Sequence, residues 1–115
     1  MFSAVWTDKA AKTYDELRRM AQASLRARQT SKKKKATKDE GLFKQVHKCI
    51  TLLLSNPRHP GLQTHEYTSL THPYDARKKV FEAYVQSRTP GAYRLFWCYG
   101  PQRDQITLIA ITPHP

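Results

Sequence analysis

The sequence predicts an α+β fold, in which an N-terminal helical hairpin packs on a small antiparallel sheet of three to four strands. Two long stretches with apolar residues every three to four positions come first, and three short β-rich stretches separated by turn residues close the chain. The chain has 115 residues, of which 39% are hydrophobic. That length suits one core of two packed layers, so residues 1–115 are expected to form a single domain.

The N-terminal quarter of the chain changes from an alternating to a helical pattern. Residues 2–7 alternate in character and contain Val and Trp, which predicts a short first strand. From Asp8 to about Arg28 one apolar stripe repeats at helical spacing, and Thr7 or Asp8 can cap the start of this helix. The stripe consists of Ala10, Tyr14, Leu17, Ala21 and Leu25.

A capping-box pattern predicts the start of the second helix. Thr37 can accept from the backbone three residues on, and Glu40 can reach back to the backbone of Thr37. The apolar face that follows ends at Ser55-Asn56-Pro57, because the residue before a proline avoids the helical region. Two such helices joined by one connector make a helical hairpin.

Three strand signals close the chain, at residues 80–86, 92–99 and 105–112. Short connections that contain Pro and Gly separate them, so they are expected to form an antiparallel meander. Side chains alternate between the two faces of a strand, which places Glu82, Tyr84 and Arg94 on one face, opposite the helices. An arginine in mid-strand there indicates either a cross-strand pair with Glu82 or a phosphate-binding group.

The charge of the chain favours a polyanionic partner. Twenty Lys and Arg face nine Asp and Glu, for a net charge of +11. Nucleic acid, an acidic membrane surface and an acidic protein all fit this excess. The run Lys32–Lys35 reads as a solvated connector between the helices, or as a contact to phosphates.

Metal, disulfide and membrane chemistry find little support in the sequence. Cys49 and Cys98 have apolar neighbours and are expected to be buried free thiols. The histidines match no zinc spacing, so neither a metal nor another cofactor is expected. No secretion signal and no apolar run near 20 residues is present, which predicts a cytoplasmic protein with no membrane partner.

An ordered set of short motifs from residue 39 to residue 115 resembles the RelE/ParE toxin superfamily of bacterial type II toxin–antitoxin systems. The set comprises a connector with a Pro-x-x-Pro-Gly-Leu pattern followed by a histidine, an aromatic-Glu strand, a Tyr-Arg strand opening, and a last apolar strand that ends near a histidine. Here these are Pro57, Pro60, Gly61, Leu62, His65, Phe81, Glu82, Tyr93, Arg94 and His114. The resemblance implies a helical hairpin on a small sheet, and a cognate antitoxin protein as partner.

The resemblance also implies an activity, because RelE-like members are mRNA interferases that cut mRNA on the ribosome without a metal. Arg94 then matches the arginine that holds the scissile phosphate, and His114 matches the C-terminal histidine that moves a proton. The candidate catalytic residues are Arg94, His114 and Glu82. The candidate RNA-binding residues lie around them: His65, Arg77, Lys78, Lys79, Tyr84, Arg88 and Tyr93.

Two departures from the family keep other functions open. Glu82 and Tyr84 stand where RelE has lysines, and Glu66 is out of alignment with the connector glutamate that some relatives use as a base. One alternative is a ParE-like toxin that acts on DNA gyrase and cuts nothing. The other is a catalytically inactive relative that binds nucleic acid. For the nuclease we expect His114 and Arg94 to open onto one basic cleft.

Overall fold

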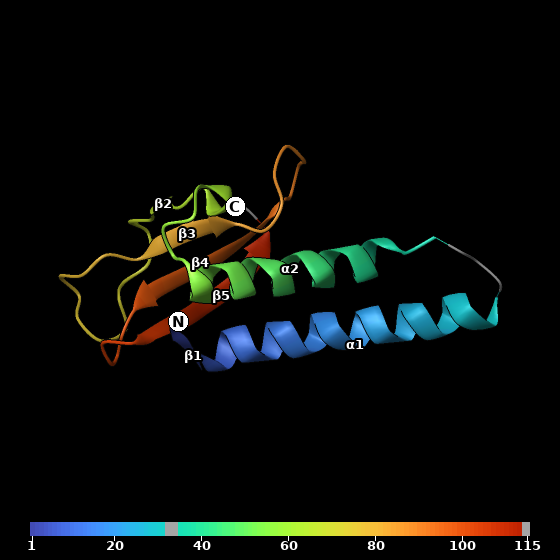
Figure 1. Cartoon of the computed structure of the whole chain (residues 1–115), viewed down its shortest axis with the longest axis horizontal. Helices are drawn as coiled ribbons and strands as arrows, with labels where there is room; N and C mark the ends of the chain where they lie inside the picture. Colours follow the sequence, from blue (N-terminus) through green and yellow to red (C-terminus); the bar gives the residue numbers. More distant parts are fainter. Residues whose placement is uncertain (32–34, 114–115) are drawn as a thin grey trace.

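The computed structural model describes residues 1–31 and 35–113. Helices α1 (Asp8–Thr30) and α2 (Lys38–Ser55) lie side by side and cover one face of a sheet (Figure 1). The predicted α+β fold and helical hairpin are therefore confirmed. The predicted His114 and most of the run Lys32–Lys35 lie outside the described residues.

The sheet is larger than the predicted three to four strands, and it is mixed. Its five strands follow the order β1 (Ser3–Trp6), β5 (Gln105–Pro113), β4 (Tyr93–Tyr99), β3 (Phe81–Tyr84) and β2 (His65–Glu66). Strands β3, β4 and β5 form the predicted antiparallel meander. The first strand joins it in parallel, since Ser3 lies opposite Gln105 and Trp6 lies opposite Leu108. The two-residue strand β2 pairs antiparallel with β3.

Local signals explain where the helices begin. The Thr7 hydroxyl accepts from the Ala10 amide at 3.1 Å and caps α1. The Thr37 hydroxyl accepts from the Glu40 amide, and the Glu40 carboxylate accepts from the Thr37 amide, so the predicted capping box starts α2. Helix α2 ends before Pro57, as the sequence predicts.

The core lies between the helices and the sheet. Leu17, Val46 and Leu53 from the helices pack with Leu95 and Ile111 from the sheet. The helix-facing side of β4 also carries Trp97, which is 1% exposed. Both cysteines are free and buried, as predicted. Among the described residues, no helix is long and apolar enough to cross a membrane.

The loop between β2 and β3 covers part of the opposite face of the sheet. The Tyr67 ring lies 4.6 Å from that of Phe96, and the Tyr74 hydroxyl bonds to Thr107 Oγ1 at 2.8 Å. His72 is buried and bonds through Nε2 to the Tyr99 carbonyl oxygen at 2.9 Å. This loop packs over Phe96 and Thr107 but not over Arg94. Arg94 is surrounded by a separate group of polar side chains.

Candidate functional site

The candidate site forms where β2, β3 and β4 run side by side. Tyr84 lies opposite Arg94 in the β3–β4 register, and His65 lies opposite Glu82 in the β2–β3 register. The predicted parity is therefore correct for Glu82, Tyr84 and Arg94. The predicted RNA-binding residue His65 joins them from the two-residue edge strand β2, a strand that the sequence did not predict.

A buried carboxylate links His65 and Arg94 in this site. Glu82 is 1% exposed, and its Oε1 lies 2.7 Å from His65 Nε2 and 3.9 Å from Arg94 Nε. The second ring nitrogen of His65, Nδ1, lies 3.2 Å from the carbonyl oxygen of Gln63. A carboxylate and a carbonyl both accept hydrogen bonds, so His65 satisfies both partners when each of its ring nitrogens carries a proton.

Several contacts hold the buried Arg94 side chain in place. Its guanidinium carbon lies 3.7 Å from the centre of the Tyr84 ring, which is a cation–π contact. Its Nη1 donates to the Gln86 carbonyl oxygen at 2.6 Å and to the Tyr93 carbonyl oxygen at 3.2 Å. The side chain is 8% exposed. Among the described residues, its Nε makes no hydrogen bond.

The remaining predicted RNA-binding residues are distributed more widely. Arg77, Lys78 and Lys79 are exposed and precede β3, where Arg77 pairs with Asp75 and Lys79 lies 3.9 Å from Glu66. Arg88 is exposed in the turn after β3, at the other end of that strand. These cations therefore flank the site from two ends.

Tyr93 does not join the site. Its side chain packs against the core on the helix-facing side of the sheet. Its amide donates to Gln86 Oε1 at 3.2 Å. The strand parity that puts Arg94 on the open face puts its neighbour Tyr93 on the opposite one.

His114 cannot be placed relative to Arg94, because it lies outside the described residues. The described part of β5 places Thr112 directly opposite Arg94. The expected common cleft of His114 and Arg94 stays a prediction.

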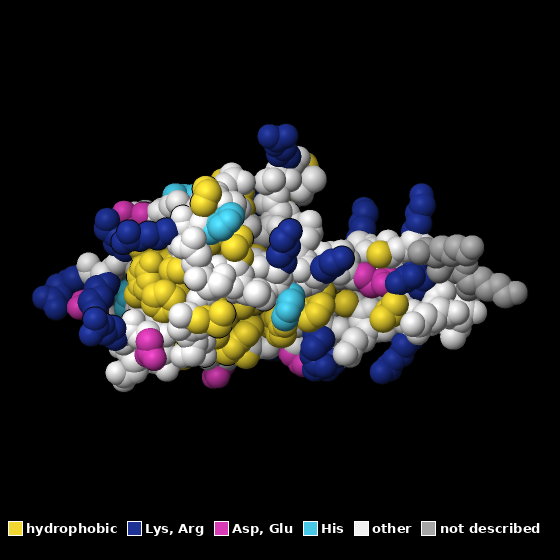
Figure 2. Space-filling model, viewed as in Figure 1, with side chains coloured by type: hydrophobic (Ala, Val, Ile, Leu, Met, Phe, Trp, Pro, Cys, Tyr) yellow, Lys and Arg dark blue, Asp and Glu magenta, His cyan; other side chains and the backbone are white. Residues whose placement is uncertain are grey.

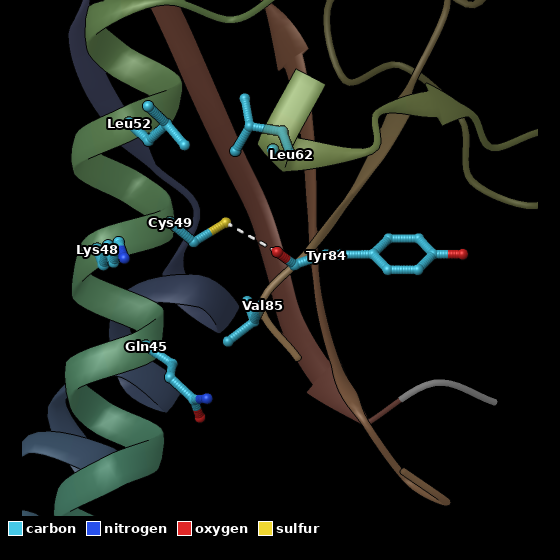
Figure 3. A pocket seen from close by; sticks show the side chains of 8 residues that line it. Gln45, Lys48, Cys49, Leu52, Leu62, Tyr84 and Val85 are labelled. Atoms are coloured by element: carbon cyan, nitrogen blue, oxygen red, sulfur yellow. Dashed lines mark hydrogen bonds between the residues drawn. The ribbon is translucent and has the colours of Figure 1, made fainter. Parts of the chain in front are cut away.

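A hollow lies between α2 and β3, apart from the candidate site (Figure 3). Cys49 donates from Sγ to the Tyr84 carbonyl oxygen at 3.6 Å, while the Tyr84 ring points away from the hollow. Burial raises the pKa of the Cys49 thiol to about 12. Cys49 therefore stays a neutral thiol near pH 7, and it is a poor nucleophile.

Comparison with known proteins gives one informative match. No family model matches the sequence, and no curated protein matches it. A solved structure described as a YoeB/ParE toxin from Agrobacterium tumefaciens superposes with a TM-score of 0.59. The superposition covers 98% of this chain and 99% of the other, at 10% sequence identity. The chain therefore shares the fold of this YoeB/ParE toxin along nearly its whole length, which agrees with the fold that the resemblance implied.

Proposed function

We propose that this protein is the toxin of a type II toxin–antitoxin system and cuts mRNA on the ribosome without a metal. The observation that carries the proposal is the polar cluster of Arg94, Glu82, His65 and Tyr84 on the sheet face that the helices leave open. Two further facts support it: the fold is that of a YoeB/ParE toxin, and the net charge of +11 suits a polyanionic substrate.

In the proposed reaction the 2′-oxygen of one nucleotide attacks the adjacent phosphorus, and the bond from phosphorus to the 5′-oxygen breaks. A base takes the proton of the 2′-hydroxyl, and an acid protonates the departing 5′-oxygen. The products are a 2′,3′-cyclic phosphate and a 5′-hydroxyl. Negative charge grows on the phosphate oxygens in the transition state, so a fixed cation beside them lowers the barrier.

Arg94 is the proposed cation. A guanidinium carries five N–H donors, and the hydrogen bonds to Gln86 and Tyr93 occupy Nη1. Nη2 is then the group that meets the phosphate. Tyr84 holds the guanidinium plane, and a tyrosine ring can also stack a base.

The remaining roles follow from exposure. Glu82 is 1% exposed, so we assign it the positioning of His65 and Arg94 and not direct contact with RNA. His65 is 49% exposed and can meet the substrate. His114 is the proposed proton carrier, two residues after Thr112, which pairs with Arg94.

The test is induction in bacteria, followed by mapping of mRNA breaks on ribosomes. Arg94→Ala and His114→Ala should each slow cleavage by about 100-fold or more, because each removes a group that acts in the transition state. Arg94→Lys keeps the positive charge but lacks the planar guanidinium with its several N–H donors. It tests whether a loss of cleavage in Arg94→Ala comes from misfolding alone. Arg26→Ala, an exposed arginine of α1, is the matched control. Intact mRNA at a toxic dose would contradict the proposal.

A cognate antitoxin is the proposed protein partner, and an acidic one suits the net charge of +11. Co-expression of this antitoxin should restore growth.

The burial of Glu82 and Arg94 favours a second candidate function. Their side chains are 1% and 8% exposed, so the pair can serve the structure of the sheet without contacting RNA. In that case the protein is a ParE-like toxin of DNA gyrase. It then inhibits supercoiling in vitro, and His114→Ala leaves that inhibition unchanged.

A further inference from the structure

A separate hollow lies on the helix-facing side of the sheet, beyond the end of α2. Its floor consists of Phe81, Trp97 and Tyr99, and its rim comes from the segment that follows α2. The hollow has a volume of about 450 Å³. Sites for small organic ligands usually fall within about 300–1,000 Å³. Because neighbouring residues of a strand face opposite sides, this hollow and the cluster around Arg94 and Glu82 occupy different faces.

The floor is a corner made by aromatic rings. The rings of Phe81 and Trp97 stack at 4.8 Å with 29° between their planes, while Tyr99 stands at 80° to both. Tyr99 is 40% exposed, so this corner is open to solvent. A flat ligand that stacks on one ring therefore places its edge against another, and both arrangements are favourable between aromatic groups.

The hollow also has a polar part to its lining, which includes His59, Gln63 and Thr64. His59 Nδ1 accepts from the Gly61 amide at 2.9 Å, which places the proton of a neutral ring on Nε2 as a donor. A ligand with donors and acceptors around a flat ring suits this lining better than an aliphatic side chain does.

Positive charge lies beside the aromatic floor. Arg58 is exposed on the rim, and it makes no ion pair within the described part of the chain. Figure 2 shows hydrophobic side chains gathered at the end of the molecule where the N-terminus lies, with Lys and Arg side chains flanking them. An aromatic surface beside cations is typical of proteins that bind single-stranded nucleic acid, where bases stack and phosphates meet the cations.

We propose that this hollow binds a base of single-stranded nucleic acid. The base stacks in the corner formed by Phe81 and Tyr99, and the adjoining phosphate meets Arg58. This site goes beyond the proposed cleavage, because it needs neither Arg94 nor any reaction.

The test uses Trp97 as a reporter. The chain has two tryptophans, so Trp6→Phe leaves Trp97 as the single indole. The probes are an RNA oligomer of about ten nucleotides, a DNA oligomer of the same sequence, and a spacer oligomer of equal charge that carries no bases. Both base-containing oligomers should quench the emission of Trp97, and their relative affinities identify the natural source. The spacer oligomer should bind without quenching.

Two substitutions separate stacking from charge. Tyr99→Ala should weaken RNA binding by about 5- to 150-fold, the usual loss for one stacked base, and leave spacer binding unchanged. Tyr99→Phe keeps the ring and should bind like the parent, which controls for folding. Arg58→Ala should weaken RNA and spacer alike and lower the salt slope by about one. Arg26→Ala, on the distant part of α1, should leave the quenching unchanged.

Three results would overturn the proposal. One is equal RNA affinity of Tyr99→Ala and the parent. Another is RNA binding with no change in the emission of Trp97. The third is quenching by an acidic peptide with a Phe or Leu anchor but not by any oligomer, which would make the hollow a protein-docking site. Arg94→Ala should keep the quenching even where cleavage is lost, so failure of the nuclease proposal is recognised separately.

Discussion

At the scale of single residues, the centre of the candidate site is the carboxylate of Glu82, which is buried between His65 and Arg94. Glu82 is 1% exposed, and it lies 2.7 Å from His65 Nε2. A buried charge is costly unless partners surround it, so this glutamate and its neighbours hold one another in place. The arrangement ties the edge strand β2 to β3 and β4 through side chains as well as through backbone pairing.

Glu82→Gln tests this arrangement. The change replaces the carboxylate by an amide and leaves Arg94 and His65 without the acceptor that they share. We expect a loss of about 1–3 kcal/mol in the free energy of unfolding, below the full value for a buried pair because His65 is half exposed. Urea unfolding at pH 7 measures it.

The neighbouring strand offers a matched control. Glu66→Gln removes an exposed carboxylate 3.9 Å from Lys79 Nζ, and it should leave stability nearly unchanged. If both substitutions destabilise the protein equally, Glu82 has no special role in holding the site.

Strand parity explains which residues of the site could be predicted. Glu82, Tyr84 and Arg94 belong to strands with clear alternation, and adjacent strands that share a short turn pair in a narrow range of registers. His65 could not be placed in the same way. Its strand has two residues, which is too short for any periodicity, and the register that sets it opposite Glu82 depends on a long loop.

At the scale of elements, one hydroxyl joins the start of α1 to an irregularity in the sheet. Strand β5 has an extra residue at Ile109, where its register with β4 shifts between Phe96 and Trp97. Thr7 Oγ1 donates to the Ile109 carbonyl oxygen at 2.7 Å and accepts from the Ala10 amide at 3.1 Å. The same side chain thus caps a helix and satisfies a bulge.

Thr7→Val removes both hydrogen bonds while keeping the shape of the side chain. We expect a loss of about 1–3 kcal/mol in unfolding free energy, the sum of a helix cap and one buried hydrogen bond. Thr13→Val, whose hydroxyl bonds to the Lys9 carbonyl oxygen on an exposed turn of the same helix, is the control. Similar losses for the two variants, measured by thermal unfolding, would contradict the double role of Thr7.

An ion pair between Arg28 and Glu40 joins the end of α1 to the start of α2, and its strength depends on pH. Hydrogen bonds from Arg28 and then from Thr37 lower the pKa of Glu40 from 4.5 to about 2. A carboxylate with a lowered pKa stabilises the fold fully above about pH 4.5, and this contribution fades as the pH falls toward about 2.

Glu40→Gln should therefore be less stable than the parent at pH 7, and the gap should narrow steadily below about pH 4.5. Glutamine preserves the capping geometry, so the comparison isolates the charge. Urea midpoints from pH 7 to pH 2 measure the gap. A gap that stays constant over this range would show that the charge of Glu40 contributes nothing.

At the scale of the whole molecule, the helices reach well beyond the sheet. The molecule measures 52 × 26 × 23 Å, and the far end of its long axis is formed by the hairpin alone (Figure 1). In this distal hairpin, residues 22–30 of α1 and 38–41 of α2, no described side chain is buried. The proximal turns, in contrast, contribute Leu17, Val46 and Leu53 to the core.

Stability should follow this division. Backbone amides in the distal hairpin should exchange with solvent about tenfold or more faster than those of the proximal turns, because opening them exposes little apolar surface. Hydrogen exchange followed by NMR measures the difference. Uniform protection along both helices would mean that the hairpin opens as one unit.

The parallel pairing of β1 with β5 could not be predicted from the sequence, which shows a strand at residues 2–7 but no partner for it. That pairing determines when the sheet can be completed during synthesis. Ser3 of β1 lies opposite Gln105 of β5, so β1 cannot pair in the sheet until β5 has been synthesised. Until then β4 also lacks its neighbour on the side where Thr112 will face Arg94. The sheet therefore stays incomplete, and the surroundings of Arg94 stay unformed, until synthesis has passed strand β5.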